Sequence, residues 1–397
     1  MGRTQPSLGL APPAQRKDAR AKAAKMTINK TIPAILASST RARKGVEGST
    51  LIVDPLGGGA KTGAKRSRKG ENEDVAAEVV ANEQVKVRVI VGDTLSVART
   101  LGQTANHVGQ PPKPKRNVAV LNMASPLLPG GGFLNGASAQ EESLCLRTTL
   151  YPALKDEFYR LPEVGAVWTE DVYVFRDDSG NDLSKNERWW VDIISAGMLR
   201  FPDVEGDEGE EPQYASAKDR DLAIRKVKCV MDILRSKGVE HCVLGAWGCG
   251  AYGNPVGEVA RVFKKVILGD GKVSKDLNGN EWGDLKEIVF AIRERRMAVD
   301  FARYLDKNLQ VEETARDQSE QVDEQDERDA EANRELEEQI SQLDKRIEQC
   351  KTRALRASLE TIRAGLKDQS AQRSTVTATT NSADEEVSAE EDEGTSE

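Results

Sequence analysis

Two adjacent glutamates, Glu141 and Glu142, are the residues of this sequence whose type and spacing most directly predict chemistry. Neighbouring carboxylates repel each other, so we expect the pair to hold one proton while the other group stays ionised. One acid beside one carboxylate suits cleavage of a glycosidic bond through an oxocarbenium-like transition state. The alternative is that both acids only complement the dipole of a helix in its first turn, which is the commoner situation for an isolated pair.

Three consecutive glycines, Gly130 to Gly132, lie upstream of these acids and follow the apolar segment 117–123. A spacer of seven residues separates Gly132 from Gln140, which directly precedes the acids. Glycines permit positive φ and carry no side chain, so a ligand can approach the backbone amides closely. Taken alone, such a segment is usually only a turn.

A second glycine-rich segment, "VLGAWGCGAYGNPVGEVARVF" at 243–263, also follows an apolar run. It predicts bare amides and a helix N-terminus near Pro255, which together suit an anion such as a diphosphate. The segment has no Gly-Lys-Ser/Thr, so it is not a Walker loop. Two such loops, each after a strand, can converge on one crevice at the edge of a sheet.

The elements that must position these loops alternate between strands and helices. The patterns predict strands at 85–91, 117–123, 171–175, 189–195, 241–247 and 286–292, and helices from Asp93 to about 101 and at 143–154, 216–237, 255–267 and 297–308. Upstream, residues 28–36 suggest a helix disturbed by Pro33, and 51–55 a short buried strand. This alternation predicts a layered α/β domain with a mixed sheet.

Charge is divided unevenly along the 397 residues, whose net charge is -8. Residues 1–70 hold 15 basic against 3 acidic side chains, and residues 311–397 hold 11 against 25. We expect residues 1–26 to be a disordered basic arm, with a mitochondrial presequence as the alternative. Basic residues up to 70 suit weak contact with a polyanion or a nuclear address, although a solvated linker is the simpler interpretation.

Other segments depart from the α/β pattern. Residues 56–80 predict a linker insertion, and residues 202–214 an acidic surface loop. Beyond the domain, 309–369 predict a charged helix whose apolar residues between 336 and 366 could form a short coiled coil for self-association; an isolated solvated helix is the alternative. Residues 370–397 are acidic and predicted to be disordered.

Composition excludes several classes of protein. No run approaches the roughly 20 apolar residues of a membrane helix, so we expect a soluble, intracellular protein without membrane contact. Five cysteines and two histidines show no metal-ligand spacing, and the thiols are expected to be packed rather than catalytic. We also expect Trp189, Trp190 and Trp247 to pack against strands rather than stack on a base.

The stretch "GGGFLNGASAQEE" resembles the signature of poly(ADP-ribose) glycohydrolases, in which three glycines precede Gln-Glu-Glu after a short spacer. Together with "LGAWGCGAYGNP" and "IVFAI", it is most similar to the microbial-type branch of that family, over about 27–308. The resemblance implies a macrodomain-like three-layer α/β/α fold with a mixed central sheet, here followed by the C-terminal helical extension. It also implies hydrolysis of the ribose–ribose bond of poly(ADP-ribose) to release ADP-ribose, without a metal or other cofactor.

Carried over by position, the resemblance makes Glu142 the acid that protonates the leaving ribose oxygen and then activates water. Glu141 would hold ribose hydroxyls with Gln140 beside it, and Asn122 would support the ribose. The remaining implied residues line the ligand's phosphates and distal ribose: Gly130, Gly131 and Gly132 in the first loop, and Gly248, Cys249, Gly250, Ala251 and Tyr252 in the second. Cys249 is expected to contribute its amide rather than its thiol. Tyr252 stands where the family usually has Phe, and no side chain is assigned to stack on adenine.

Three alternatives stay open at this point. The chain could be a reader that binds ADP-ribose without turnover, although a reader has no need for two acids. It could instead hydrolyse ADP-ribose attached singly to a protein or nucleic acid. It could also be a coiled-coil interaction protein with a degenerate enzyme domain. For the hydrolase, the implied substrate is poly(ADP-ribose) or ADP-ribosylated protein, in the nucleus or cytoplasm, with reversal of ADP-ribosylation in the DNA damage response as the implied role.

Overall fold

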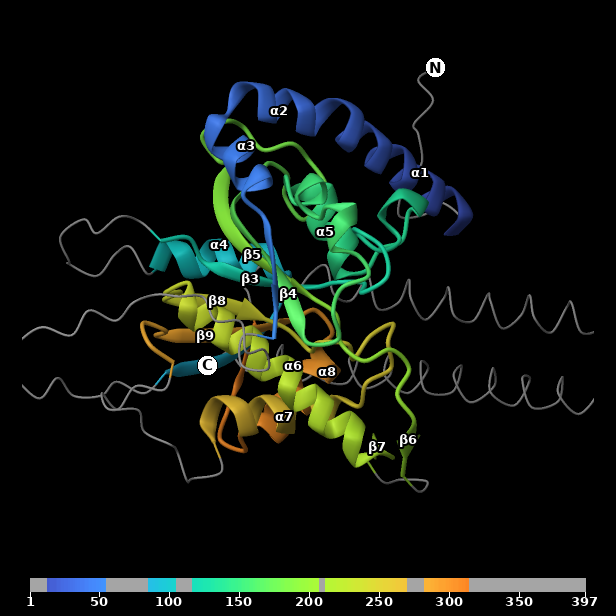
Figure 1. The fold of residues 1–397 in the computed structure, drawn as a ribbon, viewed down its shortest axis with the longest axis vertical. Coiled ribbons are helices and arrows are strands. Elements are labelled where there is room, and N and C mark those ends of the chain that lie inside the picture. Colours follow the sequence, from blue (N-terminus) through green and yellow to red (C-terminus); the bar gives the residue numbers. More distant parts are fainter. Residues whose placement is uncertain (1–12, 55–84, 105–115, 207–210, 270–281, 314–397) are drawn as a thin grey trace, which may run out of the picture. The chain divides into compact units, whose positions relative to one another are not determined.

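The computed structural model describes residues 13–54, 85–104, 116–206, 211–269 and 282–313, which all lie in one compact unit, Met1–Thr314. An eight-stranded sheet crosses this unit in the order β1-β4-β5-β3-β8-β9-β2-β10 (Figure 1). Its strands are β1 Thr50–Val53, β2 Lys86–Val91, β3 Ala119–Met123, β4 Gly165–Val174, β5 Trp189–Ala196, β8 His241–Leu244, β9 Glu287–Ile292 and β10 Val311–Glu313. Six neighbouring strands from β5 to β10 are parallel, whereas β4 is antiparallel to both β1 and β5. The sheet is therefore mixed, as predicted.

Helices cover both faces of the sheet, which gives three layers (Figure 1). They are α1 Pro13–Met26, α2 Ile32–Ser38, α3 Thr40–Glu47, α4 Thr94–Thr104, α5 Gln140–Arg147, α6 Ala217–Ser236, α7 Val256–Leu268 and α8 Arg295–Leu305. A π-helical turn, Thr27–Thr31, joins α1 to α2, and short 3-10 turns span Phe133–Asn135, Tyr151–Ala153 and Asp156–Phe158. The three-layer α/β/α architecture expected from the resemblance is present.

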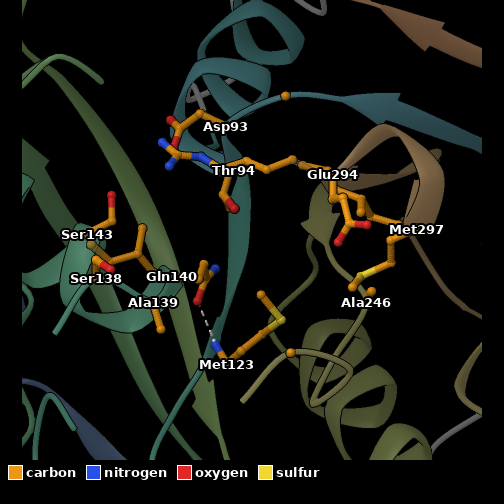
Figure 2. Close-up of a pocket in the computed structure, with 16 residues that line it drawn as sticks. Asp93, Thr94, Met123, Ser138, Ala139, Gln140, Ser143, Ala246, Glu294 and Met297 are labelled. Atoms are coloured by element: carbon orange, nitrogen blue, oxygen red, sulfur yellow. Dashed lines mark hydrogen bonds and ion pairs between the residues drawn. The ribbon is translucent and has the colours of Figure 1, made fainter. Parts of the chain in front are cut away.

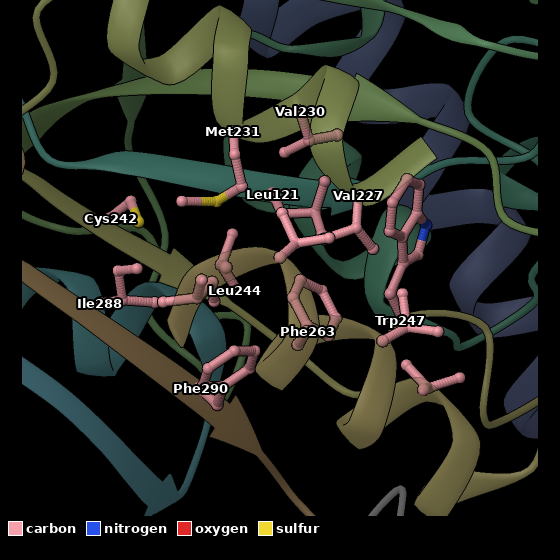
Figure 3. Close-up of a cluster of buried hydrophobic side chains, with 14 of the residues drawn as sticks. Leu121, Val227, Val230, Met231, Cys242, Leu244, Trp247, Phe263, Ile288 and Phe290 are labelled. Atoms are coloured by element: carbon pink, nitrogen blue, oxygen red, sulfur yellow. The ribbon is translucent and has the colours of Figure 1, made fainter. Parts of the chain in front are cut away.

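Strand alternation explains why both faces are covered. Along β3, Leu121 packs into the core beneath α6, α7 and α8, whereas Val120 packs into the core beneath α4 and α5. Successive side chains of a strand point to opposite faces, so a strand that is apolar on both needs a helix layer on each. Figure 3 shows the first core, in which Trp247 lies beside Val227 and Phe263. Trp247 is 1% exposed, so the prediction that it packs rather than stacks on a base is confirmed.

The structure of the first described residues differs from its prediction. Residues 13–26, assigned to a disordered arm, form helix α1. This helix has no apolar stripe that a sequence pattern could reveal; Ala24 is fully buried, and Arg20 Nε donates to the carbonyl of Gly136 at 2.7 Å. A Cβ at Gly136 would lie 2.1 Å from the Lys17 carbonyl oxygen, so the helix contacts this glycine with its backbone.

The sheet edges and one loop correct further predictions. Strand β1 exists, but it is an edge strand with no buried residue, so it is not the buried strand expected at 51–55. Residues 311–313, predicted to begin a charged helix, form β10 because Arg88 pairs with Glu312 and Arg295 pairs with Glu313. Within the predicted acidic loop, β6 Val204–Glu205 and β7 Gln213–Tyr214 form a two-stranded ribbon.

Helix α5 also differs from its prediction. It begins at Gln140 and ends at Arg147, whereas 143–154 was predicted, because Thr148 leaves the helix and bridges to Val174. Strand β4 begins at Gly165, six residues before the strand predicted at 171–175, and the helix suggested at 28–36 is divided between the π-helical turn and α2. The remaining predicted helices and strands lie within about three residues of their observed bounds. Pro33 lies in the first turn of α2, where its missing N–H is tolerated.

Several predictions fall outside the described residues. They are the linker insertion at 56–80, residues 1–12 of the basic arm, the helix or coiled coil from 314 to 369 with its self-association segment 336–366, and the acidic tail 370–397. In the described part of the chain, no helix has the length and apolarity needed to cross a membrane.

Candidate active site

Helix α5 carries the two acids, Glu141 and Glu142, in its first turn, beside the end of β3. Gln140 joins this helix to the strand. Its Oε1 accepts a hydrogen bond from the amide of Met123 at 2.9 Å, and its Nε2 donates to the carbonyl of Leu121 at 2.8 Å (Figure 2). The Gln140 amide, predicted to contact substrate, is therefore occupied in fixing the start of α5 against the strand end.

Glu141 is 3% exposed, and both of its oxygens have partners. Oε2 accepts from the amide of Ser125 at 2.7 Å, and Oε1 lies 3.5 Å from the donor Nδ2 of Asn122. Burial raises the pKa of Glu141 to about 8 against the hydrogen bond from Ser125, and the charge of Glu142 adds to the rise. Burial therefore favours the protonated form of Glu141.

Glu142 is 8% exposed, and its two carboxylate oxygens differ in their hydrogen bonding. Oε1 accepts from the amide of Gly132 at 2.8 Å, whereas Oε2 is buried and has no hydrogen-bond partner among the described residues. The acids do occupy a first helical turn, as the alternative interpretation requires. Yet these hydrogen bonds come from the loop amides of Ser125 and Gly132, so the helix dipole is not a sufficient explanation of the pair.

Two residues of the glycine triplet adopt a backbone that other residues rarely take. Gly130 has φ 67° and Gly131 has φ 55°. A Cβ at Gly131 would lie 2.8 Å from Oε1 of Glu142 and 2.9 Å from Oε2 of Glu141. The glycines therefore allow the loop to contact both carboxylates with backbone alone.

Asn122 lies at the end of β3 on the face that α5 covers. It is fully buried and pairs in register with Ser195 of β5, to whose Oγ its Nδ2 donates at 3.1 Å. Its Oδ1 is buried and has no hydrogen-bond partner in the described part of the chain. Ser195 thus orients the Asn122 amide, a role that the sequence pattern of β5 did not reveal.

The second loop, 245–253, follows β8 and has its own organising residue. The Nδ2 of Asn254 donates to the carbonyls of Gly248 at 3.0 Å and Leu199 at 2.8 Å, and its Oδ1 accepts from the hydroxyl of Tyr214 at 2.9 Å. This buried side chain supports the left-handed turn at Gly248, whose φ is 80°. The sequence analysis did not identify Asn254.

The tip of this loop is open to solvent. Gly250 is exposed, and no atom lies within 4 Å of a Cβ placed there. Burial raises the pKa of the Cys249 thiol to about 12, so the thiol stays protonated. This state is consistent with the prediction that Cys249 contributes its amide. Helix α7 begins two residues after Asn254 and directs its N-terminus toward the loop.

Tyr252 connects the two loops. It is half-buried and forms a side-chain hydrogen bond with Ser125, the residue whose amide binds Glu141. Its carbonyl accepts from the amide of Phe201 at 3.0 Å. The structure therefore brings Tyr252 beside the acid pair, although more than a hundred residues separate them in sequence.

A cavity of about 220 Å³ lies between the loops, toward the ends of β2 and β9 (Figure 2). Its walls include Thr94, Ser138, Gln140, Gly250, Ile292 and Met297. Gln140 and Gly250 are shared between the cavity and the predicted site. The cavity therefore adjoins the predicted site at these two residues.

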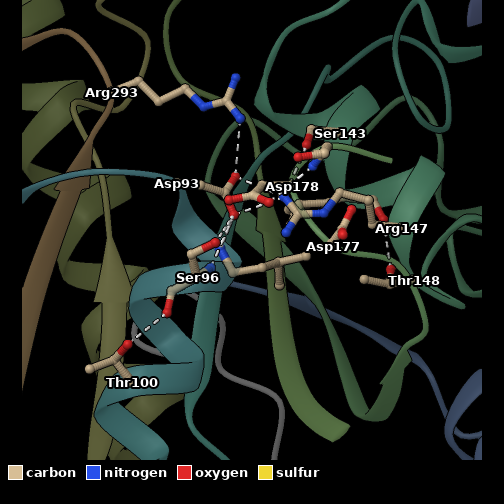
Figure 4. A network of polar contacts seen from close by, with 12 residues as sticks. Asp93, Ser96, Thr100, Ser143, Arg147, Thr148, Asp177, Asp178 and Arg293 are labelled. Atoms are coloured by element: carbon tan, nitrogen blue, oxygen red, sulfur yellow. Dashed lines mark hydrogen bonds and ion pairs between the residues drawn. The ribbon is translucent and has the colours of Figure 1, made fainter. Parts of the chain in front are cut away.

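One wall of the cavity contains a buried ion pair (Figure 4). Arg147, 4% exposed, donates from one nitrogen to both oxygens of Asp93 at 2.8 Å. Asp93 also accepts from the amides of Leu95 and Ser96, which confirms its predicted role as the cap of α4. Burial alone would raise the pKa of Asp93, but Arg147 and Arg293 outweigh it and hold this pKa below its usual range. Both ends of α5 are thus fixed, by Gln140 and by Arg147.

Residues 25–177 match the family model of the microbial-type PARG catalytic domain, where PARG is poly(ADP-ribose) glycohydrolase. The matched part contains Asn122, the glycine triplet and both acids; the loop at 245–253 lies beyond it. The resemblance to microbial-type PARG is confirmed.

Solved PARG structures from Thermomonospora curvata support the same fold. The crystal structure of PARG from Thermomonospora curvata is 23% identical, covers 72% of this chain and 99% of its own, and has a TM-score of 0.51. The same PARG bound to the inhibitor ADP-HPD has 23% identity, the same coverages and a TM-score of 0.50. PARG from Deinococcus radiodurans in complex with ADP-ribose is 25% identical over 56% of this chain and 86% of its own, with a TM-score of 0.43. No curated protein matches the sequence significantly.

The PARG-like site can be compared with its prediction. The structure brings the glycine triplet, Glu141, Glu142, Asn122 and Tyr252 together at one edge of the sheet. The residues that hold them were not predicted, since Ser195 and Arg147, and Asn254 through Leu199 and Tyr214, make contacts distant in sequence. A signal was present for Asn254, because a polar residue between Gly253 and Pro255 is suited to a turn.

Proposed function

We propose that this chain hydrolyses the ribose–ribose O-glycosidic bond of poly(ADP-ribose) and releases ADP-ribose, with Glu142 as general acid and base. One observation carries the proposal. Glu142 is buried with Oε1 fixed by the Gly132 amide, while Oε2 has no partner among the described residues. Protonation of a leaving oxygen requires a carboxyl group that is held in place and still has one oxygen free of hydrogen bonds within the protein.

The proposed reaction needs one proton to move twice. Glu142 donates its proton to the leaving ribose oxygen as the bond from that oxygen to the anomeric carbon breaks. A water molecule then bonds to the anomeric carbon and gives its proton to the Glu142 carboxylate, which restores the acid. Glu141, held by Ser125 and Asn122, would accept or donate hydrogen bonds at the ribose hydroxyls.

The two loops would bind the rest of the released unit. The amide of the exposed tip at Gly250 suits phosphate oxygens, and the α7 N-terminus adds a favourable dipole. The amides of Gly130 to Gly132 donate within the protein, but these residues carry no side chain and would leave room for the distal ribose. The cavity beyond Gly250 has apolar walls at Ile292 and Met297, which suit the adenosine end. Tyr252 would lie against the ribose next to the acids.

Purified protein tests this function when it is incubated with poly(ADP-ribose) and, separately, with a protein carrying single ADP-ribose groups. We expect free ADP-ribose from the polymer, detected by chromatography. Binding of the polymer without release would make the chain a reader. Release from the singly modified protein alone would assign the hydrolase to mono-ADP-ribose.

A further inference from the structure

The carboxyl ends of the central strands β3 and β8 separate two neighbouring parts of the molecule. The cavity lies at the ends of β2 and β9, the acids and loops lie at β3 and β8, and the segment after β5 lies on the other side. If the released unit occupies the loops and the cavity, as proposed above, the remaining polymer must leave toward β5. The residues that follow β5 are therefore in position to contact it.

Two exposed side chains follow β5 at this place, Arg200 and Phe201. The Phe201 ring is 66% exposed and lies 6.2 Å from the Tyr252 ring in an edge-on arrangement. The Arg200 guanidinium lies 5.5 Å from both ring centroids. We call Arg200 and Phe201 the platform; through Tyr252 it is continuous with the acid pair.

The backbone of Phe201 is held in an unusual conformation. Its φ is 51°, in the left-handed region that a bulky residue rarely adopts. The amide of Phe201 donates to the carbonyl of Tyr252 at 3.0 Å, which fixes this turn against the second loop. A large aromatic ring that is both strained and exposed gains little from packing, so a ligand contact is the better explanation.

A groove of about 460 Å³ continues from the platform. It is lined by Pro126, Leu161, Met198, Phe201, Asp219 and Lys226, among others. The Lys226 ammonium already donates to the carbonyls of Glu163 and Gly197, and Asp203 and Asp219 add negative charge. Glu163 and Arg200 also line the groove, so three acidic residues face two basic ones there. This balance disfavours a phosphate, whereas a neutral base with an amino donor suits it.

We infer that Phe201 and Arg200 form a stacking platform for the adenine base of the ADP-ribose unit that stays on the polymer. This inference rests on the proposed function. In that polymer the leaving oxygen belongs to an adenosine ribose, so an adenine lies directly beside the bond that breaks. Stacking of a base on an aromatic side chain contributes about 1–3 kcal/mol, and Arg200 can add a cation–π contact.

The test uses the full chain with Glu142→Gln, so that binding is measured without turnover. Its probes are ADP-ribose and di(ADP-ribose), titrated by calorimetry. Adding Phe201→Ala should weaken di(ADP-ribose) binding about five- to tenfold, the change that roughly 1–1.4 kcal/mol produces, and leave ADP-ribose binding unchanged. Phe201→Trp should retain the affinity. Val204→Ala, at an exposed aliphatic residue nearby, should change neither affinity.

The outcomes separate this inference from the proposed function. Equal weakening of both ligands by Phe201→Ala, or no weakening of di(ADP-ribose), would overturn the platform while leaving the hydrolase intact. Failure of the Glu142→Gln protein to bind ADP-ribose would instead contradict the proposed site and, with it, the platform.

Discussion

The amide of Gly132 donates a 2.8 Å hydrogen bond to Oε1 of Glu142, so the glycine triplet holds the carboxylate proposed to perform the chemistry. From the sequence, these glycines were predicted to form either a simple turn or a loop that a ligand can approach closely. In the structure they also set the position of the acid, because a side chain at Gly131 would collide with both carboxylates. Loop and acid are therefore one unit.

Gly131→Ala should lower kcat at least about 100-fold, because displacing a catalytic group by about 1 Å can cost that much. The added Cβ would lie 2.8 Å from Oε1 of Glu142, and the carboxylate must move. Steady-state release of ADP-ribose measures the effect.

Gly180→Ala is the matched control for this substitution. Gly180 has φ 84°, also left-handed, but no atom lies within 4 Å of its Cβ position. Both variants should lose about 1–2 kcal/mol of stability to backbone strain. Only Gly131→Ala should lose activity; equal turnover by the two variants would show that the glycine is not needed to place the acid.

Glu141→Gln should make the stability of the protein less dependent on pH. The folded pKa of about 8 lies above the ordinary value of 4.5, so the folded state binds the proton more tightly than the unfolded chain does. Stability from this group is full below pH 4.5 and is lost as the pH rises toward 8. The variant cannot ionise there, so it should exceed the wild type at pH 8.5 by a few kcal/mol, on the order expected from such a shift.

Urea unfolding at pH 5 and pH 8.5 measures this difference. Glu157→Gln, at an exposed glutamate of the 3-10 turn Asp156–Phe158, is the control and should give the same difference at both pH values. If Glu141→Gln also behaved identically at the two pH values, the proton would not reside on Glu141.

Arg147→Met should destabilise the protein by about 3–5 kcal/mol at pH 7, because it leaves the buried Asp93 without its main partner. Arg225→Met removes an ion pair with Asp54 from a side chain that is 61% exposed, and should cost less than about 1 kcal/mol. Arg147 lowers the pKa of Asp93, so its contribution to the free energy of unfolding should be present at neutral pH. This contribution should disappear as the pH falls through the lowered pKa of Asp93 and the carboxylate takes up a proton. Equal costs for the two arginines would argue against the buried pair.

The local sequence pattern predicted most strands of the sheet and both glycine-rich loops. Strands such as β3 are apolar on both faces, and glycines are typical of turns. The sequence pattern did not predict elements that are stabilised by contacts with residues far away in the sequence. Helix α1 has no apolar stripe and depends on Gly136, and β10 depends on Arg88. In the site, the acids were visible as neighbours in sequence. Their supports Ser195 and Arg147 were not, since only the fold brings them together with Asn122 and Asp93.

The most direct measurement compares Glu142→Gln with the unmodified protein for both turnover of poly(ADP-ribose) and affinity for ADP-ribose. Because Gln keeps the oxygen that accepts from Gly132 but cannot donate an acidic proton, release of ADP-ribose should fall at least about 100-fold, within the range that general acid–base catalysis contributes, while ADP-ribose binds with nearly the same affinity. A Glu142→Gln protein that still releases ADP-ribose at the rate of the unmodified chain would contradict the role proposed for Glu142.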